Sequence, residues 1–313
     1  MVISVGGLLT ETCAVSVKTK VWITGGGGLI GSFLRRLIPQ SFQPIAPSHH
    51  ELELTDEVAV RKFFARTDPE LIIHCAGLTR SPSCQQDPKL ARTLNVDLTR
   101  RLVELAGKRP LYLFSTDLVF DGRKGDYAED EAVNPMSVYG ATKAEAEQIV
   151  LAHSQHVVVR TSINAGHSPT GDRAFNEELC RAWKSGKTTR LFVDEFRCPI
   201  PAEITARAAW ELVQSNARGI FHLAGPERLS RFEIGRLVAR YSSGIEAMIE
   251  ASFLRDYDGP PRSPDTSLDC RKIQRRLSFQ IPAFTAWLER NPNFQSRVLS
   301  TSPDRKTVDR ELE

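Results

Sequence analysis

The chain has 313 residues, of which 41% are hydrophobic and 25% are charged. Its 41 basic and 38 acidic side chains leave a net charge of +3, which gives no electrostatic reason to expect nucleic acid as a partner. No apolar run approaches the roughly 20 residues that would cross a bilayer. The six cysteines show no paired spacing, which argues against a disulfide framework or a zinc site. We therefore expect a cytoplasmic globular protein without a metal centre or a membrane partner.

Short apolar runs alternate with helical patterns along the first half of the chain. The runs predict strands at 20–24, 42–46, 71–75, 111–115 and 156–160. Between them, apolar spacing predicts helices over 29–37, after an N-cap at Asp56, over 94–105 and over 137–152. This alternation predicts an α/β fold with a doubly wound parallel sheet, a Rossmann fold, covered by helices on both faces.

Beyond residue 163 the alternation loosens. Helices are expected at 175–183 and 204–213, after a capping box at 230–233, and around 284–288, with short strands at 190–193 and 219–222. We expect residues 20–163 to form mainly a dinucleotide-binding domain. Residues 164–294 would form mainly a smaller C-terminal substrate lobe that also returns to the sheet, and 1–19 and 295–313 an N-terminal extension and a polar tail.

A glycine-rich loop, residues 24–31, joins the first expected strand to the first helix. Gly25 would make the tight turn, Gly28 would let backbone N–H groups approach a pyrophosphate, and Gly31 would let the helix pack closely on the strand. Such a loop alone could be only a flexible turn. The strand before it and the amphipathic helix after it favour dinucleotide binding.

The end of the second expected strand lacks the acid that would bind the adenosine ribose of NAD. Residues 45–50 are Ile-Ala-Pro-Ser-His-His, and the first acid is Glu51. Ser48, with Arg35 or Arg36 nearby, is compatible with a 2′-phosphate, so NADP is favoured over NAD. The alternative is that the two arginines only solvate a helix face.

Tyr139 and Lys143 lie one helical turn apart on the same face. Reduction of a carbonyl requires a hydride from a nicotinamide and a proton for the developing alkoxide. An adjacent ammonium lowers the pKa of a phenol, which is otherwise near 10. Thr116, or Ser115 as the second choice, would orient the carbonyl from the end of the fourth expected strand. A Tyr-x-x-x-Lys pair can arise by chance; its place at the carboxyl edge of the sheet favours catalysis.

Together these residues resemble the extended short-chain dehydrogenases/reductases, and more narrowly the dTDP-4-dehydrorhamnose reductases and related sugar-nucleotide reductases. The narrower resemblance rests on residues 115–122 and 134–140, with shorter similar stretches at 51–56, 94–96, 159–162, 194–199 and 262–269. It covers roughly residues 20–294.

The resemblance implies a reductase of a nucleotide-linked 4-keto sugar that uses NADP or NAD, with Thr116, Tyr139 and Lys143 catalytic. Besides Ser48, it assigns cofactor binding to Gly25, Gly28, Leu29, Ile30, Gly31, Glu53, Leu54, Ala76, Gly77, Tyr139 and Lys143. It assigns substrate binding to Thr116, Leu118, Ile163 and Arg262. Glu53 could instead be only a charge near a helix start, and Ala76 and Gly77 could be simple strand-end packing.

Two departures concern the sugar pocket: Leu118 and Ile163 stand where these reductases usually carry aromatic residues. They leave the hydride chemistry intact but make dTDP-4-dehydrorhamnose itself doubtful, and another 4-keto sugar nucleotide is an alternative. An epimerase or dehydratase that retains its cofactor, with Asp117 as an acid beside Thr116, also stays open. So do a nucleotide-binding regulatory subunit and a homodimer.

Three histidines, His74, His167 and His222, are spread through the chain without metal-ligand spacing. We expect structural roles for them. Cys198 could line the substrate site, although a buried inert thiol is the more common case.

Overall fold

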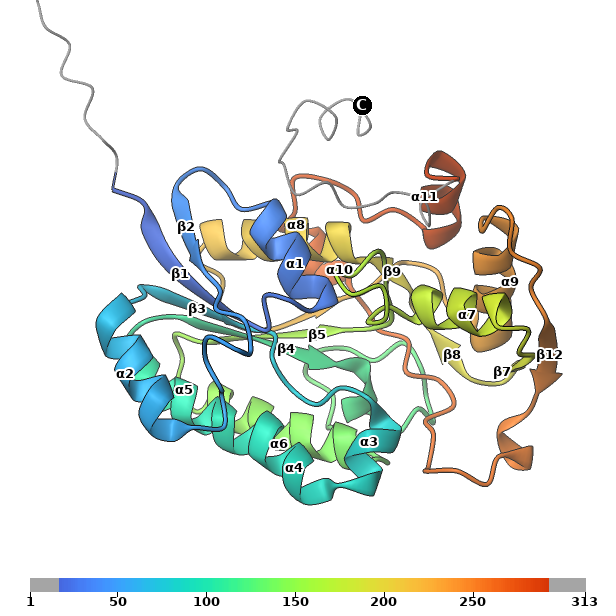
Figure 1. Ribbon diagram of the computed structural model, residues 1–313, viewed down its shortest axis with the longest axis horizontal. Helices are drawn as coiled ribbons and strands as arrows, with labels where there is room; N and C mark the ends of the chain where they lie inside the picture. Colours follow the sequence, from blue (N-terminus) through green and yellow to red (C-terminus); the bar gives the residue numbers. More distant parts are fainter. Residues whose placement is uncertain (1–16, 293–313) are drawn as a thin grey trace, which may run out of the picture.

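The computed structural model describes residues 17–292 (Figure 1). Most of the expected N-terminal extension and all of the expected polar tail lie outside these residues. The first strand begins at Thr19, where the backbone pairs with Phe42.

Six parallel strands form the central sheet, in the order β10-β5-β4-β3-β1-β2. They are β1 (Thr19–Thr24), β2 (Phe42–Ile45), β3 (Leu71–His74), β4 (Leu111–Thr116), β5 (Val157–Thr161) and β10 (Gly219–Leu223). The doubly wound parallel sheet is thus confirmed. Because β2 lies on one side of β1 and β3 on the other, the strand order reverses there, and open α/β sheets bind ligands at such a reversal.

One face of the sheet is covered by α1 (Leu29–Arg36) and α8 (Ala202–Gln214), with the short α10 (Arg271–Gln274) near β10 (Figure 1). The buried side chains of β1 and β5 on this face pack against both long helices. Trp210 of α8 donates its indole hydrogen to the carbonyl of Leu34 at 3.0 Å. Two helices far apart in the sequence therefore form one layer.

The opposite face carries α2 (Glu57–Thr67), α5 (Leu98–Ala106) and α6 (Val138–Leu151) (Figure 1). Trp22 of β1 is fully buried there and packs on Phe63, with ring centroids 5.1 Å apart. The predicted N-cap at Asp56 is confirmed, because its carboxylate accepts the backbone N–H of Ala59 at 3.0 Å.

The segment between β3 and α5 differs from the single helix predicted over 94–105. It contains α3 (Ser81–Gln86), α4 (Pro88–Arg92) and a π-helical turn, Thr93–Asp97, before α5. Pro82 and Pro88 each stand at a helix start, where proline is tolerated, so the chain restarts a helix there. The wider π turn contains Asn95 and changes the direction of its side chain relative to a regular α-helix.

The C-terminal lobe is built from short segments at one end of the sheet (Figure 1). Three two-stranded pairs, β6-β9, β8-β11 and β7-β12, accompany its helices. The elements are β6 (Asn164–Ala165), α7 (Phe175–Lys184), β7 (Thr189–Phe192), β8 (Phe196–Arg197), β9 (Ile200–Pro201), β11 (Leu229–Ser230), α9 (Arg231–Arg240), β12 (Ile249–Ser252) and α11 (Phe284–Arg290). The capping box of α9 is confirmed between Ser230 and Glu233.

Candidate active site

The glycine loop packs directly against the chain that follows β3. Gly25 has a φ of +69°, and a Cβ there would lie 2.7 Å from the backbone nitrogen of Ala76. The N–H of Gly28 donates to the carbonyl of Gly25 at 2.9 Å, and Gly28 is the N-cap of α1. The loop and the helix start with Leu29 and Ile30 therefore lie next to the chain at Ala76–Gly77, and the N–H groups of this helix start suit a phosphate.

The region after β2 lies beside this loop and is held by local hydrogen bonds. The backbone N–H of Ser48 donates to Glu51 at 2.7 Å, a bond that lowers the pKa of that carboxyl. Glu53 accepts from the N–H of Thr55 at 2.9 Å, which lowers the pKa of Glu53 as well. Arg35 runs alongside the loop, since a Cβ on Gly26 would lie 3.1 Å from its Cδ.

The predicted threonine and tyrosine meet at the carboxyl edge of the sheet. Thr116 ends β4, and its hydroxyl lies close enough to the phenol of Tyr139 to lower the pKa of that phenol. Helix α6 starts at this level because Ser137 caps it, accepting the N–H of Gly140 at 3.1 Å. Gly140 in turn lets α6 approach the carbonyl of Leu118 too closely for any Cβ. Leu118 packs in the same apolar cluster as Tyr139, so it lines the site.

Burial controls the protonation of both α6 residues. It raises the pKa of the Tyr139 phenol well above the usual value, although the hydrogen bond to Thr116 opposes the rise. Burial also lowers the pKa of Lys143 to about 8, and the charge of Glu147 works against that shift. The phenol therefore keeps its proton at neutral pH, which is the form that a proton donor requires.

Lys143 faces the end of β3. It interacts electrostatically with Cys75 and His74, one and two residues before Ala76. Below it, Glu147 forms a buried ion pair with Arg160 at 2.8 Å. The structure thus places Lys143 near the chain that packs on the glycine loop, and Tyr139 and Thr116 at the same carboxyl edge of the sheet.

Asn95 is a site residue that the sequence analysis did not single out. Its side-chain amide donates to the carbonyl of Leu78 and to the hydroxyl of Thr142, each at 3.0 Å, and its oxygen accepts the N–H of Leu78 at 2.8 Å. It therefore ties the loop after β3 to α6. In the sequence, the feature that could have identified Asn95 is its polar amide within an apolar helical pattern, Leu94-Asn-Val96.

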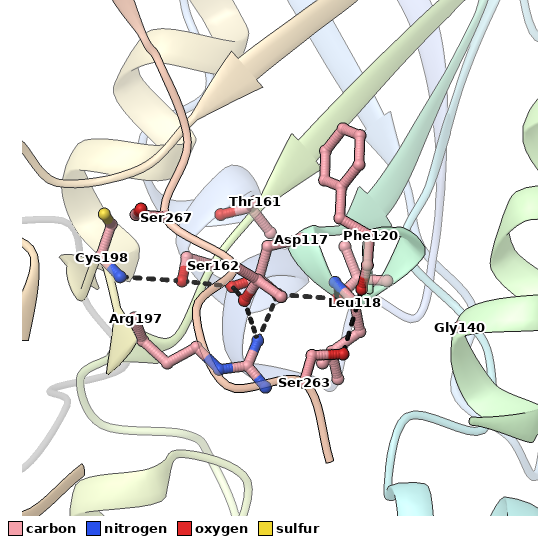
Figure 2. A network of polar contacts seen from close by, with 12 residues as sticks. Asp117, Leu118, Phe120, Gly140, Thr161, Ser162, Arg197, Cys198, Ser263 and Ser267 are labelled. Atoms are coloured by element: carbon pink, nitrogen blue, oxygen red, sulfur yellow. Dashed lines mark hydrogen bonds and ion pairs between the residues drawn. The ribbon is translucent and has the colours of Figure 1, made fainter. Parts of the chain in front are cut away.

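Asp117, directly after Thr116, is the centre of a buried polar network (Figure 2). Its carboxylate accepts from the hydroxyl of Ser162 at 2.6 Å and pairs with the guanidinium of Arg197 at 2.8 Å (Figure 2). Ser162 also accepts the backbone N–H of Cys198 at 3.2 Å. This network joins the carboxyl edge of the sheet to the C-terminal lobe, and no sequence pattern predicts the Asp117–Arg197 pair.

A second group of charges continues from Arg197 into the lobe. Glu195 is fully buried, lies 3.3 Å from Arg197, and pairs with Arg262 at 2.6 and 2.9 Å. Burial works to raise the pKa of Glu195, but the arginines outweigh it and hold this pKa below its usual value. Arg262 opens onto a cavity of about 410 Å³. The cavity is lined by Arg190, Leu191, Phe192, Arg231, Ser252, Asp256, Tyr257 and Arg262.

The predicted residues fall at different places in the fold. The glycine loop with Ala76 and Gly77, and the set Thr116, Leu118, Tyr139 and Lys143, lie at the carboxyl edge of the sheet. Ser48, Glu53 and Leu54 follow the end of β2. Arg262 lies in the lobe and is connected to this edge through the ion pairs of Glu195, Arg197 and Asp117. Ile163 follows Ser162, is half-buried, and accepts the N–H of Ile200 at 2.9 Å.

The histidines are engaged within the fold. His74 lies between the hydroxyls of Thr24 at 2.7 Å and Thr99 at 3.1 Å, and burial lowers its pKa to about 3. Burial also lowers the pKa of His222 to about 3. Within residues 17–292 no group of three or more His, Cys, Asp or Glu side chains is placed to hold a metal ion. No helix in that range is long and apolar enough to cross a membrane.

Comparison with known proteins decides the family. The model of the RmlD substrate binding domain matches residues 19–293. The chain belongs to this family. It is thereby an NAD(P)-dependent oxidoreductase of the extended short-chain dehydrogenase/reductase type, as the resemblance implied.

Individual proteins are similar to this chain over most of its length. The Probable low-salt glycan biosynthesis reductase Agl14 of Haloferax volcanii is 27% identical over 83% of this chain and 93% of that protein. Methionine adenosyltransferase 2 subunit beta of Xenopus laevis is 26% identical, covering 82% of both chains. The dTDP-4-dehydrorhamnose reductase of Bacillus anthracis in complex with NADP has the same fold, with a TM-score of 0.80 and 22% identity over 88% of this chain and 98% of that one.

Proposed function

We propose that the chain reduces the keto group of a nucleotide-linked 4-keto sugar with NADPH. The observation that carries this proposal is the placement of the Tyr139 phenol beside the Thr116 hydroxyl at the end of β4, with Lys143 one turn along α6. Reduction requires a protonated donor next to the carbonyl oxygen, and burial keeps the Tyr139 phenol protonated.

A bound dinucleotide would supply the hydride, and the side chains of the protein would have separate roles in binding and proton transfer. The helix start after Gly28 would hold the pyrophosphate of the dinucleotide, and Lys143 would hold its ribose. Tyr139 gives its proton to the carbonyl oxygen as negative charge develops there. Thr116 orients the same oxygen by a hydrogen bond, and the ammonium of Lys143 stabilises the tyrosinate that remains.

The cavity in the lobe supports a nucleotide diphosphate as the other part of the substrate. Arg190, Arg231 and Arg262 line it together with the rings of Phe192 and Tyr257. Of the described residues, none places a carboxylate within 4 Å of Arg231, and burial lowers the pKa of its guanidinium. A bound diphosphate would compensate the charge of Arg231, and the rings could stack on a base.

Arg35 supports the preference for NADPH. It lies along the glycine loop beside Ala46, at the end of β2, where an acid would otherwise bind the ribose of NAD. A guanidinium at this point would attract a 2′-phosphate. The NADP complex of the Bacillus anthracis reductase is consistent with this choice.

The test is a cofactor-oxidation screen that combines several 4-keto sugar nucleotides with NADPH and with NADH. We expect turnover with at least one sugar, faster with NADPH, and a loss of at least about 1000-fold in kcat for Tyr139→Phe with NADPH still bound. No turnover with any sugar, or full activity of Tyr139→Phe, would contradict the proposal.

The geometry of Asp117 weighs against a dehydratase. An acid for elimination must hold a proton, but the Asp117 carboxylate accepts from hydroxyls and pairs with Arg197. A dehydratase or an epimerase would also show no net consumption of NADPH, so the same screen separates them from the reductase.

A regulatory subunit is the second candidate, favoured by the similarity to methionine adenosyltransferase 2 subunit beta. It predicts tight NADPH binding without turnover, and a stable complex with a methionine adenosyltransferase catalytic subunit. The assembled Thr116, Tyr139 and Lys143 favour the enzyme, because a subunit that performs no reduction has no use for a buried proton donor.

A further inference from the structure

A line of alternating charges and polar groups runs from the proposed catalytic threonine to the cavity in the lobe. Thr116 donates to Asp117 at 3.1 Å, Asp117 pairs with Arg197 at 2.8 Å, and Arg197 lies 3.3 Å from Glu195. Glu195 then pairs with Arg262 at 2.6 Å. The side chains of Asp117, Arg197 and Glu195 are all at least nine-tenths buried. Isolated buried charges are costly, so each member depends on its neighbours.

The decisive detail is that one oxygen of Asp117 accepts a hydrogen bond and also forms an ion pair. Both the Thr116 hydroxyl and the Arg197 guanidinium bind Oδ1, whereas Ser162, at 2.6 Å, and Thr266, at 3.2 Å, bind Oδ2. A carboxylate has about four lone-pair sites, and three hydrogen bonds and one ion-pair contact surround this one.

Catalysis requires one of these four contacts to break. To orient a substrate carbonyl, Thr116 must turn its only hydrogen away from Asp117 and toward the substrate. Without a second donor, this rotation would leave a buried carboxylate oxygen short of a partner, which costs free energy. Arg197 already binds that oxygen, and its own position is fixed by Glu195 and by a 2.8 Å hydrogen bond to Thr266.

We propose that Arg197 is a positioning residue for the Thr116 hydroxyl: by binding Oδ1 of Asp117, it lets Thr116 turn its hydrogen to the substrate oxygen without leaving that carboxylate oxygen bare. This inference rests on the proposed reductase function. The competing assignment makes Arg197 a ligand of a substrate phosphate, because its Nε is buried without a hydrogen-bond partner among the described residues.

The first experiment separates kcat from KM. For Arg197→Met we expect kcat to fall about 10- to 100-fold, with the KM of NADPH and of the sugar nucleotide within about twofold, because Asp117 then retains the Thr116 hydrogen. Arg197→Lys keeps a cation near Asp117 and should recover part of the loss. Arg197→Met/Asp117→Asn should also recover kcat relative to Arg197→Met, because an amide needs no cation beside it.

A change in KM without a change in kcat would overturn the proposal. If Arg197→Met and Arg197→Lys raise the KM of the sugar nucleotide and leave kcat unchanged, Arg197 binds substrate. If the double variant is no better than Arg197→Met, the loss does not pass through Asp117. Arg271→Met is the matched control, because this exposed arginine pairs with Asp269 at 2.5 Å away from the network, and it should leave both constants unchanged.

A second experiment needs no turnover and therefore distinguishes failure of this inference from failure of the proposed function. Thr116→Val and Arg197→Met each remove one donor from Oδ1, and together they remove both. We expect the melting temperature of the double variant to fall by more than the sum of the two single losses. Additive losses would show that the two donors do not share the oxygen and would overturn the proposal. If Arg197→Met does not fold, Arg197→Lys takes its place in the cycle.

Discussion

The two ends of the proposed site are built differently. Thr116 stands at the end of the central strand β4, and Tyr139 and Lys143 stand on one long helix, α6. The cavity around Arg262 is instead assembled from β7, the start of α9, and the chain at 252–262. Regular elements therefore position the proton chemistry, whereas short segments shape the substrate cavity, and buried charges connect the two. The difference predicts that changes at one end act on kcat and changes at the other on KM.

The largest effect should come from Thr116→Val. Loss of the hydroxyl removes a hydrogen bond to the developing oxyanion, so we expect kcat to fall about 100- to 1000-fold with little change in KM. Steady-state kinetics on the sugar identified by the screen measure both constants. Thr116→Ser keeps the hydroxyl and should retain most of the activity. A change in KM alone would contradict the prediction that substitutions at the catalytic end act on kcat.

Substitution of Lys143 tests whether the buried ammonium at the catalytic end lowers the free energy of unfolding. Its folded pKa of about 8 lies below the unfolded value near 10.4, so the unfolded state binds more protons between these values and stability rises as the pH rises through that window. Lys143→Met should therefore stabilise the protein by up to about 3 kcal/mol at pH 7 while abolishing activity.

Chemical unfolding at pH 7 and pH 10 measures the difference between wild type and Lys143→Met. The difference should shrink at the higher pH. Lys62→Met, on the exposed face of α2, is the control and should show no such trend. If Lys143→Met is less stable than wild type at pH 7, the buried ammonium does not destabilise the folded protein, and the inference is wrong.

At the other end, Arg262→Met should raise the KM of the sugar nucleotide about 10- to 100-fold and change kcat by only a few fold. Arg262 lines the cavity, while Arg197 still pairs with Glu195 after its loss. Competition by the free nucleoside diphosphate offers an independent measurement, since its inhibition constant should rise in parallel. An unchanged KM would place the diphosphate elsewhere.

A smaller change is expected at the cofactor's adenosine end. Arg35→Ala should reduce the preference for NADPH over NADH about tenfold, because one charge-assisted contact to the 2′-phosphate is lost. The ratio of kcat/KM for the two cofactors measures it, and Arg36→Ala on the same helix is the matched control. Equal effects of both substitutions would point to a general surface charge instead.

The smallest effect lies outside the site. Asp56→Ala removes the N-cap of α2 and should lower the free energy of unfolding by about 1 kcal/mol without altering kinetics. Denaturant unfolding measures it, with Asp56→Asn as the conservative control. A loss of activity would mean that α2 influences the candidate active site.

The sequence predicted the sheet well because its strands are short apolar runs between clear helical patterns. Tyr139, Lys143 and Thr116 were predicted because their spacing and position follow from that pattern. Asn95 was missed because a π turn, which has no spacing signal of its own, aims it at Leu78 and Thr142. The Asp117–Arg197 pair was missed because it joins residues 80 positions apart. Such pairings depend on how loops fold over the sheet, which local patterns do not encode.

The edge strand β10 has a consequence for dissection of the chain. It is contributed by residues 219–223, yet it pairs along the whole of β5. A fragment ending near residue 163 would keep five strands but leave the three consecutive valines, 157–159, on an unpaired edge. Exposed apolar edges template aggregation. We therefore expect the fragment ending near residue 163 to aggregate when it is expressed without the C-terminal half.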